Sequence, residues 1–240
     1  MLHLFDLKKI IESLKYQSRE YRMYRKARIW SNAELKKFAH LFTGRIINVS
    51  AWKDDDKEGK RYKEYFINAS EYWISNIEGY KGLSGLENEI YLDLEEDLPQ
   101  DLEEAFDVVY NHTTLEHVFN VHKAFDNLVK LTKDILILVV PFVQDQHESP
   151  SYGDYWRFTP QGIIKNLENR GMEVLYCSTN NFKNSAIYIF VIASKKPENW
   201  RNIIKRHVSN GRVCVTESLL WRLICGLKSL KNKIYGIINP

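Results

Sequence analysis

The chain has 240 residues, of which 44% are hydrophobic and 27% charged, a composition that excludes a disordered chain and allows one sizeable core. The net charge is +3, but residues 1–40 and 195–240 each carry ten Lys/Arg, against four and two Asp/Glu, whereas residues 41–194 carry 14 Lys/Arg against 25 Asp/Glu. The longest apolar run, residues 135–143, is far shorter than the roughly 18 residues of a membrane-spanning helix, and because the first residues have no apolar core or small-residue cleavage site, we expect no secretion signal.

The first 43 residues are expected to form a helical extension. Residues 6–30 place Leu7, Ile10 and Leu14 on one stripe, the pattern of an amphipathic helix. Ser31 and Glu34 have the spacing of a capping box, which predicts a second helix over residues 32–42 that Gly44 would end.

Short apolar runs and helical patterns then alternate through residues 44–196. Helices are expected over 121–131 and from Thr159 and Pro160, as N-cap and first helical residue, to just before Gly171, with a short helix or turn at 62–68. Strands are expected at 45–50, 72–75, 89–92, 107–110, 134–141, 174–177 and 187–194. This order predicts an α/β domain with a mostly parallel, seven-stranded sheet and helices on both faces.

The C-terminal region, residues 197–240, is expected to be helical and basic. Within 219–238, apolar residues can share one face beside Arg222 and three lysines, the pattern of a helix that lies on an anionic membrane surface. Docking of this helix on the body, or on a second copy in a homodimer, is the alternative. Cys177, Cys214 and Cys225 lack metal-ligand spacing, so we expect free thiols and a cytoplasmic protein, associated with the inner face of the membrane if the helix is an anchor.

Polar and small residues follow each of the first five expected strands. Ligands of open α/β sheets bind beyond the carboxyl ends of the strands, where a ribose needs acceptors after the second strand and an adenine amino group after the third. The candidate residues in strand order are Asn48, Ser50, Ala51 and Trp52, then Asn76, then Asp93 and Leu94, then Asn111 and His112, and finally Phe142 and His147.

Two stretches carry a resemblance to a known family. FDVVYNHTTLEHVFNVHKAFDNLVKLTKDILILVVPF, residues 106–142, resembles the second half of a class I, Rossmann-like S-adenosylmethionine-dependent methyltransferase. HESPSYGDYWRFTPQGIIKNLENRGMEVL, residues 147–175, resembles a subgroup associated with bacterial surface-polysaccharide biosynthesis. The resemblance covers about residues 44–194 and implies S-adenosylmethionine as cofactor, with a sugar, nucleotide-sugar or glycan as acceptor.

The cofactor loop departs from the family pattern. An acidic residue, an apolar one and then glycine, small residue and glycine are usual, whereas this chain has Asn48-Val49-Ser50-Ala51-Trp52. The acidic residue usual after the second strand is Asn76, which can still accept a hydrogen bond but carries no charge. The resemblance implies that the cofactor lies against Asn48, Ser50, Ala51, Asn76, Asp93, Leu94 and Asn111.

His147 is the expected catalytic residue. Methyl transfer to a hydroxyl requires removal of the hydroxyl proton, commonly by a His or a carboxylate, and His147 follows the fifth strand, where the resemblance implies the acceptor. Glu116 and His117 are the next candidates. The acceptor is expected to contact a dense polar and aromatic set, namely Tyr152, Asp154, Tyr155, Trp156 and Arg157.

Other interpretations stay open. The missing glycines allow a catalytically silent, methyltransferase-like module that binds or assembles partners, and a phosphate-type, amine or nucleic-acid acceptor could replace the sugar, although no nucleic-acid-binding signature is present. The run Asp54-Asp55-Asp56 is expected to be a solvated loop because lysines flank it and no second ligand cluster is evident, so we expect no metal site.

Overall fold

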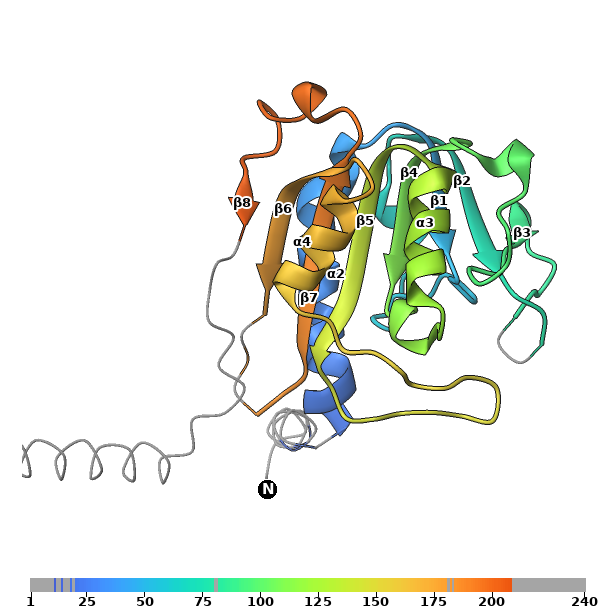
Figure 1. Cartoon of the computed structure of the whole chain (residues 1–240). Coiled ribbons are helices and arrows are strands. Elements are labelled where there is room, and N and C mark those ends of the chain that lie inside the picture. Colours follow the sequence, from blue (N-terminus) through green and yellow to red (C-terminus); the bar gives the residue numbers. More distant parts are fainter. Residues whose placement is uncertain are drawn as a thin grey trace, which may run out of the picture.

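An eight-stranded sheet forms the centre of the computed structural model, with the strand order β3-β2-β1-β4-β5-β7-β6-β8 (Figure 1). Its strands are β1 (Gly44–Val49), β2 (Ala69–Asn76), β3 (Glu89–Tyr91), β4 (Phe106–His112), β5 (Thr132–Val143), β6 (Glu173–Thr179), β7 (Ile187–Ser194) and β8 (His207–Val208). Strand β7 runs antiparallel to β5 and β6, and all other neighbours are parallel. The parallel strands therefore end at one common edge, where the expected site residues gather.

The structure describes residues 20–208 except 80, 81, 181 and 183, together with Ile11, Leu14 and Ser18. Cys214, Cys225, the expected amphipathic helix at 219–238 and the first part of the expected helix at 6–30, apart from Ile11, Leu14 and Ser18, lie outside the described residues. Among the described helices, none is long and apolar enough to cross a membrane.

Helices cover both faces of the sheet. Helix α2 (Lys26–Phe38), which continues from a π-helical turn at Tyr21–Arg25, lies behind the sheet in Figure 1, and α3 (Val121–Leu131) and α4 (Pro160–Glu168) lie in front of it. The remaining helical segments are short 3-10 turns at Ala39–Leu41, Tyr62–Tyr65, Gln100–Leu102, Leu115–His117 and Pro197–Asn199.

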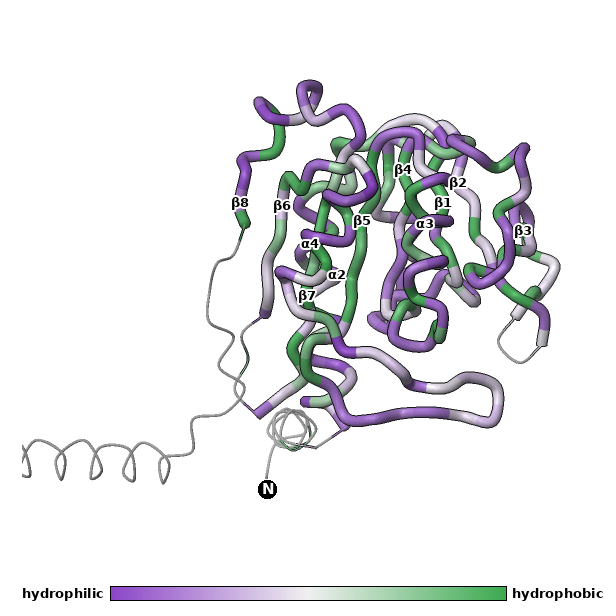
Figure 2. Tube along the Cα trace, in the orientation of Figure 1, coloured by the Kyte–Doolittle hydropathy of each residue, from purple (hydrophilic) through white to green (hydrophobic). Residues whose placement is uncertain are grey.

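Two hydrophobic layers sandwich the sheet. Successive side chains of β5 alternate between them: Leu136 and Leu138 pack towards α3 and α4, whereas Ile135 and Ile137 pack in the layer that includes α2. Figure 2 shows β5 and β7 as hydrophobic along most of their length, as expected of central strands buried on both faces.

The predicted α/β architecture is confirmed in most of its elements. Helix α3 has the predicted bounds, and Thr159 caps α4, its Oγ1 accepting the Gly162 N–H at 3.0 Å. The eighth strand, β8, was not expected; it pairs with β6 at Tyr176 and Cys177. Cys177 is free and buried.

The predicted capping box at Ser31 is wrong. Ser31 lies inside α2, where its hydroxyl donates to the Arg28 carbonyl at 2.9 Å and lies 2.9 Å from His112 Nε2. Because these partners satisfy the hydroxyl within a continuous helix, the chain does not restart at this residue. The single helix packs its Ala27 and Leu35 against the sheet.

Candidate functional site

A cavity of about 520 Å³ opens at the carboxyl ends of the parallel strands. This volume lies within the usual range for a small-molecule site. The segment between β5 and α4, drawn in yellow, crosses this edge of the sheet below α3 (Figure 1). The cavity is therefore bounded by strand ends on one side and by this crossing segment on the other.

Nine of the residues predicted for the site line this single cavity, and four do not. Those that line it are Asn48, Ser50, Ala51, Asn76, Asp93, Leu94, His147, Tyr152 and Tyr155. Those that do not are Asn111, Asp154, Trp156 and Arg157. Trp52 and His112, which the sequence also singles out, belong to the wall.

The loop after β1 turns without glycine and is held against β2. Ser50 and Trp52 have φ angles of 57° and 51°, in the left-handed region where a side chain is strained. The N–H groups of Ser50, Ala51 and Trp52 donate in turn to the Ser75 hydroxyl, the Ser75 carbonyl and the Asn76 side chain. These three donors are thus used within the protein.

Asn76 binds this loop through both the oxygen and the nitrogen of its carboxamide. Its Oδ1 accepts the Trp52 N–H at 2.6 Å, and its Nδ2 donates to the Trp52 carbonyl at 3.0 Å and to Glu89 at 2.6 Å. An aspartate could not donate either of the last two bonds. The residue that stands at the family's ribose position therefore organises the loop.

Two of the three residues predicted as a solvated acidic loop are buried, so that prediction is wrong. Asp54 accepts hydrogen bonds from Asn48 Nδ2, the Tyr72 hydroxyl and the Lys63 N–H. Asp56 accepts from the Tyr65 hydroxyl and two backbone N–H groups. These carboxylates anchor the segment between β1 and β2, which has no α-helix to support it.

Asn111 supports the first strand from behind the cavity. It is fully buried, and its Nδ2 donates to the Val49 carbonyl at 3.0 Å. Its Oδ1 has no hydrogen-bond partner.

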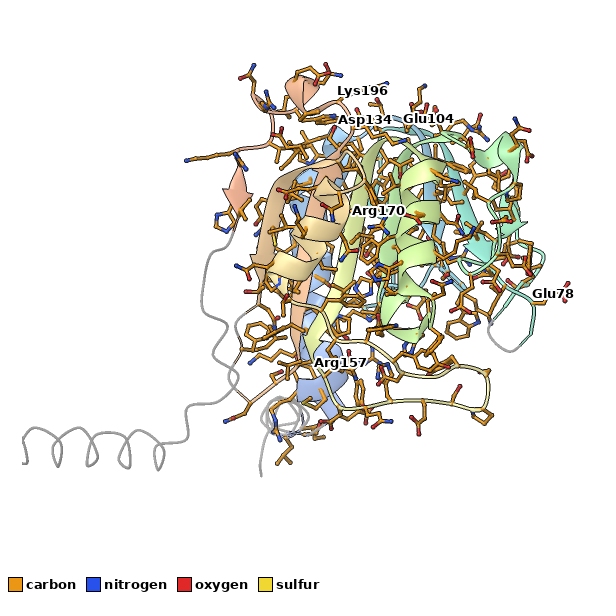
Figure 3. All side chains as sticks on the ribbon, in the orientation of Figure 1. Glu78, Glu104, Asp134, Arg157, Arg170 and Lys196 are labelled. Atoms are coloured by element: carbon orange, nitrogen blue, oxygen red, sulfur yellow. The ribbon has the colours of Figure 1, made fainter. Side chains whose placement is uncertain are left out.

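An ion pair holds the crossing segment in shape. Arg157 donates to both oxygens of Asp154, and to the carbonyls of Gln144, Asp145 and Trp156. Figure 3 shows Arg157 at the edge of the molecule opposite Glu104, Asp134 and Lys196. Burial alone would raise the pKa of Asp154, but hydrogen bonds from Arg157 and from the His147 N–H lower it to about 2.

Trp156 also binds protein groups. Its indole N–H lies 3.0 Å from the Val118 carbonyl and 3.2 Å from the Phe119 carbonyl. Its contact ties the crossing segment to the turn before α3.

Aromatic rings stand at the cavity mouth. Phe119 and Tyr155 line the cavity, are 67% and 51% exposed, and meet edge to face with ring centroids 5.3 Å apart. Tyr152 also lines the cavity, and its ring contacts the ring of His117, with centroids 4.6 Å apart. Such exposed aromatic faces suit a ligand with an apolar ring face and polar edges.

Glu116, His117 and His147 form a tight cluster, of which the two histidines line the cavity. One ligand atom of each lies within 4.8 Å of the others, and the two imidazole centroids are 4.8 Å apart. Glu116 is fully buried, and neither of its carboxyl oxygens has a hydrogen-bond partner. Burial raises the pKa of Glu116 to about 8, and burial also lowers the pKa of His117.

Arg28 is a wall residue that the sequence analysis missed. It comes from α2, and its guanidinium donates to the Tyr62 hydroxyl at 3.2 Å and to Thr113 Oγ1 at 3.0 Å. Burial, and then the Arg28 charge, lower the pKa of His112 well below its usual value. The only sequence signal for Arg28 as a site residue is the excess of basic residues among the first 40.

A second hollow, of about 770 Å³, lies at the opposite edge of the sheet. Lys195 and Arg201 line it, together with the acidic residues Glu168 and Glu173. None of the predicted site residues lines it, and Arg201 is already paired with Glu173 at 2.6 Å. The chemistry predicted from the sequence therefore belongs to the smaller cavity.

Comparisons with known proteins identify the fold. No protein-family model matches the chain, and no curated protein matches its sequence. The 1,6-didemethyltoxoflavin-N1-methyltransferase of Burkholderia thailandensis, with bound 1,6-didemethyltoxoflavin and S-adenosylhomocysteine, is 15% identical over 79% of this chain and 87% of its own, with a TM-score of 0.51.

An S-adenosylmethionine-dependent methyltransferase from Clostridium acetobutylicum is 10% identical over 78% of this chain and 98% of its own, with a TM-score of 0.50. Both similarities cover more than three quarters of this chain, at an identity that shows the fold alone. The chain therefore has the Rossmann-like α/β fold of class I methyltransferases.

Proposed function

We propose that this protein is an S-adenosylmethionine-dependent methyltransferase that methylates a sugar hydroxyl of a surface glycan or its precursor. The observation that carries the proposal is the single cavity at the strand ends, which joins residues expected for the cofactor to residues expected for the acceptor. The methyltransferase fold and the two quoted stretches of sequence support the same reading.

The cavity offers groups of suitable chemistry for the parts of the cofactor. Asp93 can accept from the adenine amino group while Leu94 packs on the ring, and Arg28 supplies a cation for the carboxylate of the methionine part. Asn76 is engaged by Trp52, so the ribose has to compete for it or bind without it. We therefore expect cofactor binding to be weak.

The aromatic mouth and His147 define the proposed acceptor side. Phe119 and Tyr155 can pack on a sugar ring, and Tyr152 and His147, which both contact the ring of His117, line the same cavity. When bound, the cofactor supplies an electrophilic methyl group on sulfur. A hydroxyl directed at His147 has to lose its proton as its oxygen bonds to that methyl carbon and the methyl–sulfur bond breaks, which leaves S-adenosylhomocysteine; His147 promotes the loss of the proton.

A catalytically silent module is the second candidate, because one observation favours it. The three backbone N–H groups of residues 50–52 donate to β2, so none of them is available to a ligand. A module of this kind would bind partners through the same aromatic mouth without transferring a methyl group.

Mass spectrometry of candidate acceptors separates these functions. The full chain is incubated with S-adenosylmethionine carrying a deuterated methyl group and with nucleotide sugars, glycan fragments, amines, phosphate compounds or RNA. We expect label on a sugar hydroxyl, and at least tenfold less of it with Tyr155→Ala, which removes one face of the mouth. If only an amine, a phosphate compound or an RNA base is labelled, that group is the acceptor and the sugar is not. If no acceptor is labelled, the result favours the silent module.

A further inference from the structure

The most unusual group in the described part of the chain is the carboxyl of Glu116. It is fully buried, and both oxygens lack a partner, although its own backbone carbonyl accepts the N–H groups of Tyr155 and Trp156. Protonation would remove its charge but would leave an O–H donor without an acceptor. A buried polar group of this kind is costly unless something binds it.

Two imidazoles lie next to this carboxyl, and their hydrogen bonds define which nitrogen is available. His117 Nδ1 lies 2.6 Å from the Gly153 carbonyl oxygen, which can only accept, so Nδ1 carries the proton. Its Nε2 then has a lone pair, and it lies 3.9 Å from Glu116 Oε1. The neutral imidazole thus presents a ligand atom to the carboxyl.

His147 repeats this arrangement. Its Nδ1 lies 3.3 Å from the Asp145 carbonyl and 3.4 Å from Asp154 Oδ2, both acceptors, so Nδ1 again carries the proton and Nε2 the lone pair. A histidine that binds a metal almost always donates its other N–H to a carbonyl or carboxylate in this way. Asp154 is in turn held by the ion pair with Arg157.

We propose that Glu116, His117 and His147 bind one divalent transition-metal ion. Two imidazoles and one carboxylate are a set that suits Zn²⁺, Fe²⁺, Co²⁺ or Mn²⁺ and leaves positions open for a ligand, whereas Mg²⁺ prefers oxygen ligands. Ligands bound at about 2.1 Å lie roughly 3 to 4 Å apart, so the three ligand atoms, now within 4.8 Å of one another, have to approach by roughly 1 Å when the ion binds.

The open positions of such an ion face the cavity, because His117 and His147 line it. The ion would bind an acceptor hydroxyl and lower the pKa of that hydroxyl. His147 would then promote the loss of the proton by holding the ion, and not by accepting the proton itself. This role rests on the proposed methyl transfer; the binding of the ion does not. The proposal replaces the expectation from the sequence that there is no metal site.

Cobalt binding tests the proposal without cofactor or acceptor. The full chain is stripped with EDTA and titrated with Co²⁺, whose visible absorption reports imidazole ligation and coordination number. We expect one ion per chain, with Zn²⁺ displacing it and Mg²⁺ failing to do so. Glu116→Gln and His147→Gln should each weaken binding by roughly 100-fold, and Asp154→Asn, which changes a group behind His147, by about 10-fold or more.

His122→Gln is the matched control, because His122 is an exposed histidine on α3 outside the cavity. It should bind Co²⁺ like the parent. Absence of a saturable spectrum in the parent, or equal affinity in the parent and in Glu116→Gln, would overturn the proposal. If the chain does not bind Co²⁺ but transfers methyl groups in EDTA, the metal proposal fails and the proposed function stands. If the chain binds Co²⁺ but transfers no methyl group, the metal proposal stands and the proposed function fails.

Discussion

Ser50, Trp52 and Asp54 each adopt a left-handed backbone conformation in the turn after β1, with φ between 51° and 60°. Each costs roughly 1 kcal/mol relative to glycine. The structure offsets this cost with buried hydrogen bonds, above all those of Asp54 and Asn76. A chain without the usual glycines can therefore still make the turn, provided that these side chains remain.

This bonding predicts what Asn76→Asp, which restores the acidic residue usual in the family, does to stability. An aspartate would lose the bonds that Asn76 donates to Trp52 and Glu89, and would place a carboxylate beside the one at Glu89. We expect the free energy of unfolding to fall by roughly 2–4 kcal/mol at pH 7, measured by urea denaturation.

Asn68→Asp is the control, because Asn68 is exposed and makes one bond, to the His40 carbonyl. It should change stability much less. If Asn76→Asp were as stable as the parent, the hydrogen bonds between Asn76 and the Trp52 backbone would contribute little to the free energy of unfolding.

Asp154 carries a second prediction, on pH. Folding lowers its pKa from the usual 3.8 to about 2, so its stabilisation is fully present above about pH 4 and is lost as the pH falls through 2. Asp154→Asn should reduce the free energy of unfolding by roughly 2 kcal/mol at pH 7, and by about half as much at pH 3. Urea denaturation at both pH values, with EDTA present, measures the difference. A loss that is equal at the two pH values would contradict the assignment.

Among the elements, the helix α4 gives a test of a sequence signal that the structure bears out. Its N-cap, Thr159, accepts the Gly162 N–H. Thr159→Ala should lower the free energy of unfolding by about 1 kcal/mol, whereas Gln161→Ala, at an exposed position two residues further on in the first turn, should leave it nearly unchanged. Equal effects of the two substitutions in thermal denaturation would mean that the cap does not stabilise the helix.

The elements that could be predicted are those whose signals are local. The apolar run of β5 and the 3.6-residue pattern of α3 depend on neighbours within one element, and both lie where they were predicted. Ser31 fails because its capping signal is overridden by a contact with His112, 81 residues away. β8 has two residues and no pattern to detect.

The site follows the same division. Residues that end strands could be placed in one cavity because parallel strands end at one edge. Arg28 could not, since only tertiary packing brings α2 to that edge, and the buried roles of Asp54 and Asp56 depend on tyrosines at 65 and 72. Asp154 and Arg157 were predicted to contact the acceptor, because the sequence does not show that these two side chains form an ion pair with each other.

At the scale of the whole molecule, the acidic middle and basic ends still support the proposal of a peripheral membrane contact through residues 219–238. The point at which to shorten the chain follows from the structure: Ile204 is buried, Trp200 donates to Asp134, and β8 pairs with β6. A chain ending at residue 208 should keep the thermal stability of the full chain yet no longer float with anionic liposomes. Equal flotation of both chains, or of neither, would contradict the anchor.

The central claim is that the cavity at the strand ends is a cofactor site, and calorimetric titration with S-adenosylhomocysteine tests it most directly. We expect saturable, weak binding of one molecule per full-length chain, lost in Asp93→Ala because the adenine amino group loses its acceptor. Absence of heat up to millimolar ligand, or binding that Asp93→Ala leaves unchanged, would contradict it.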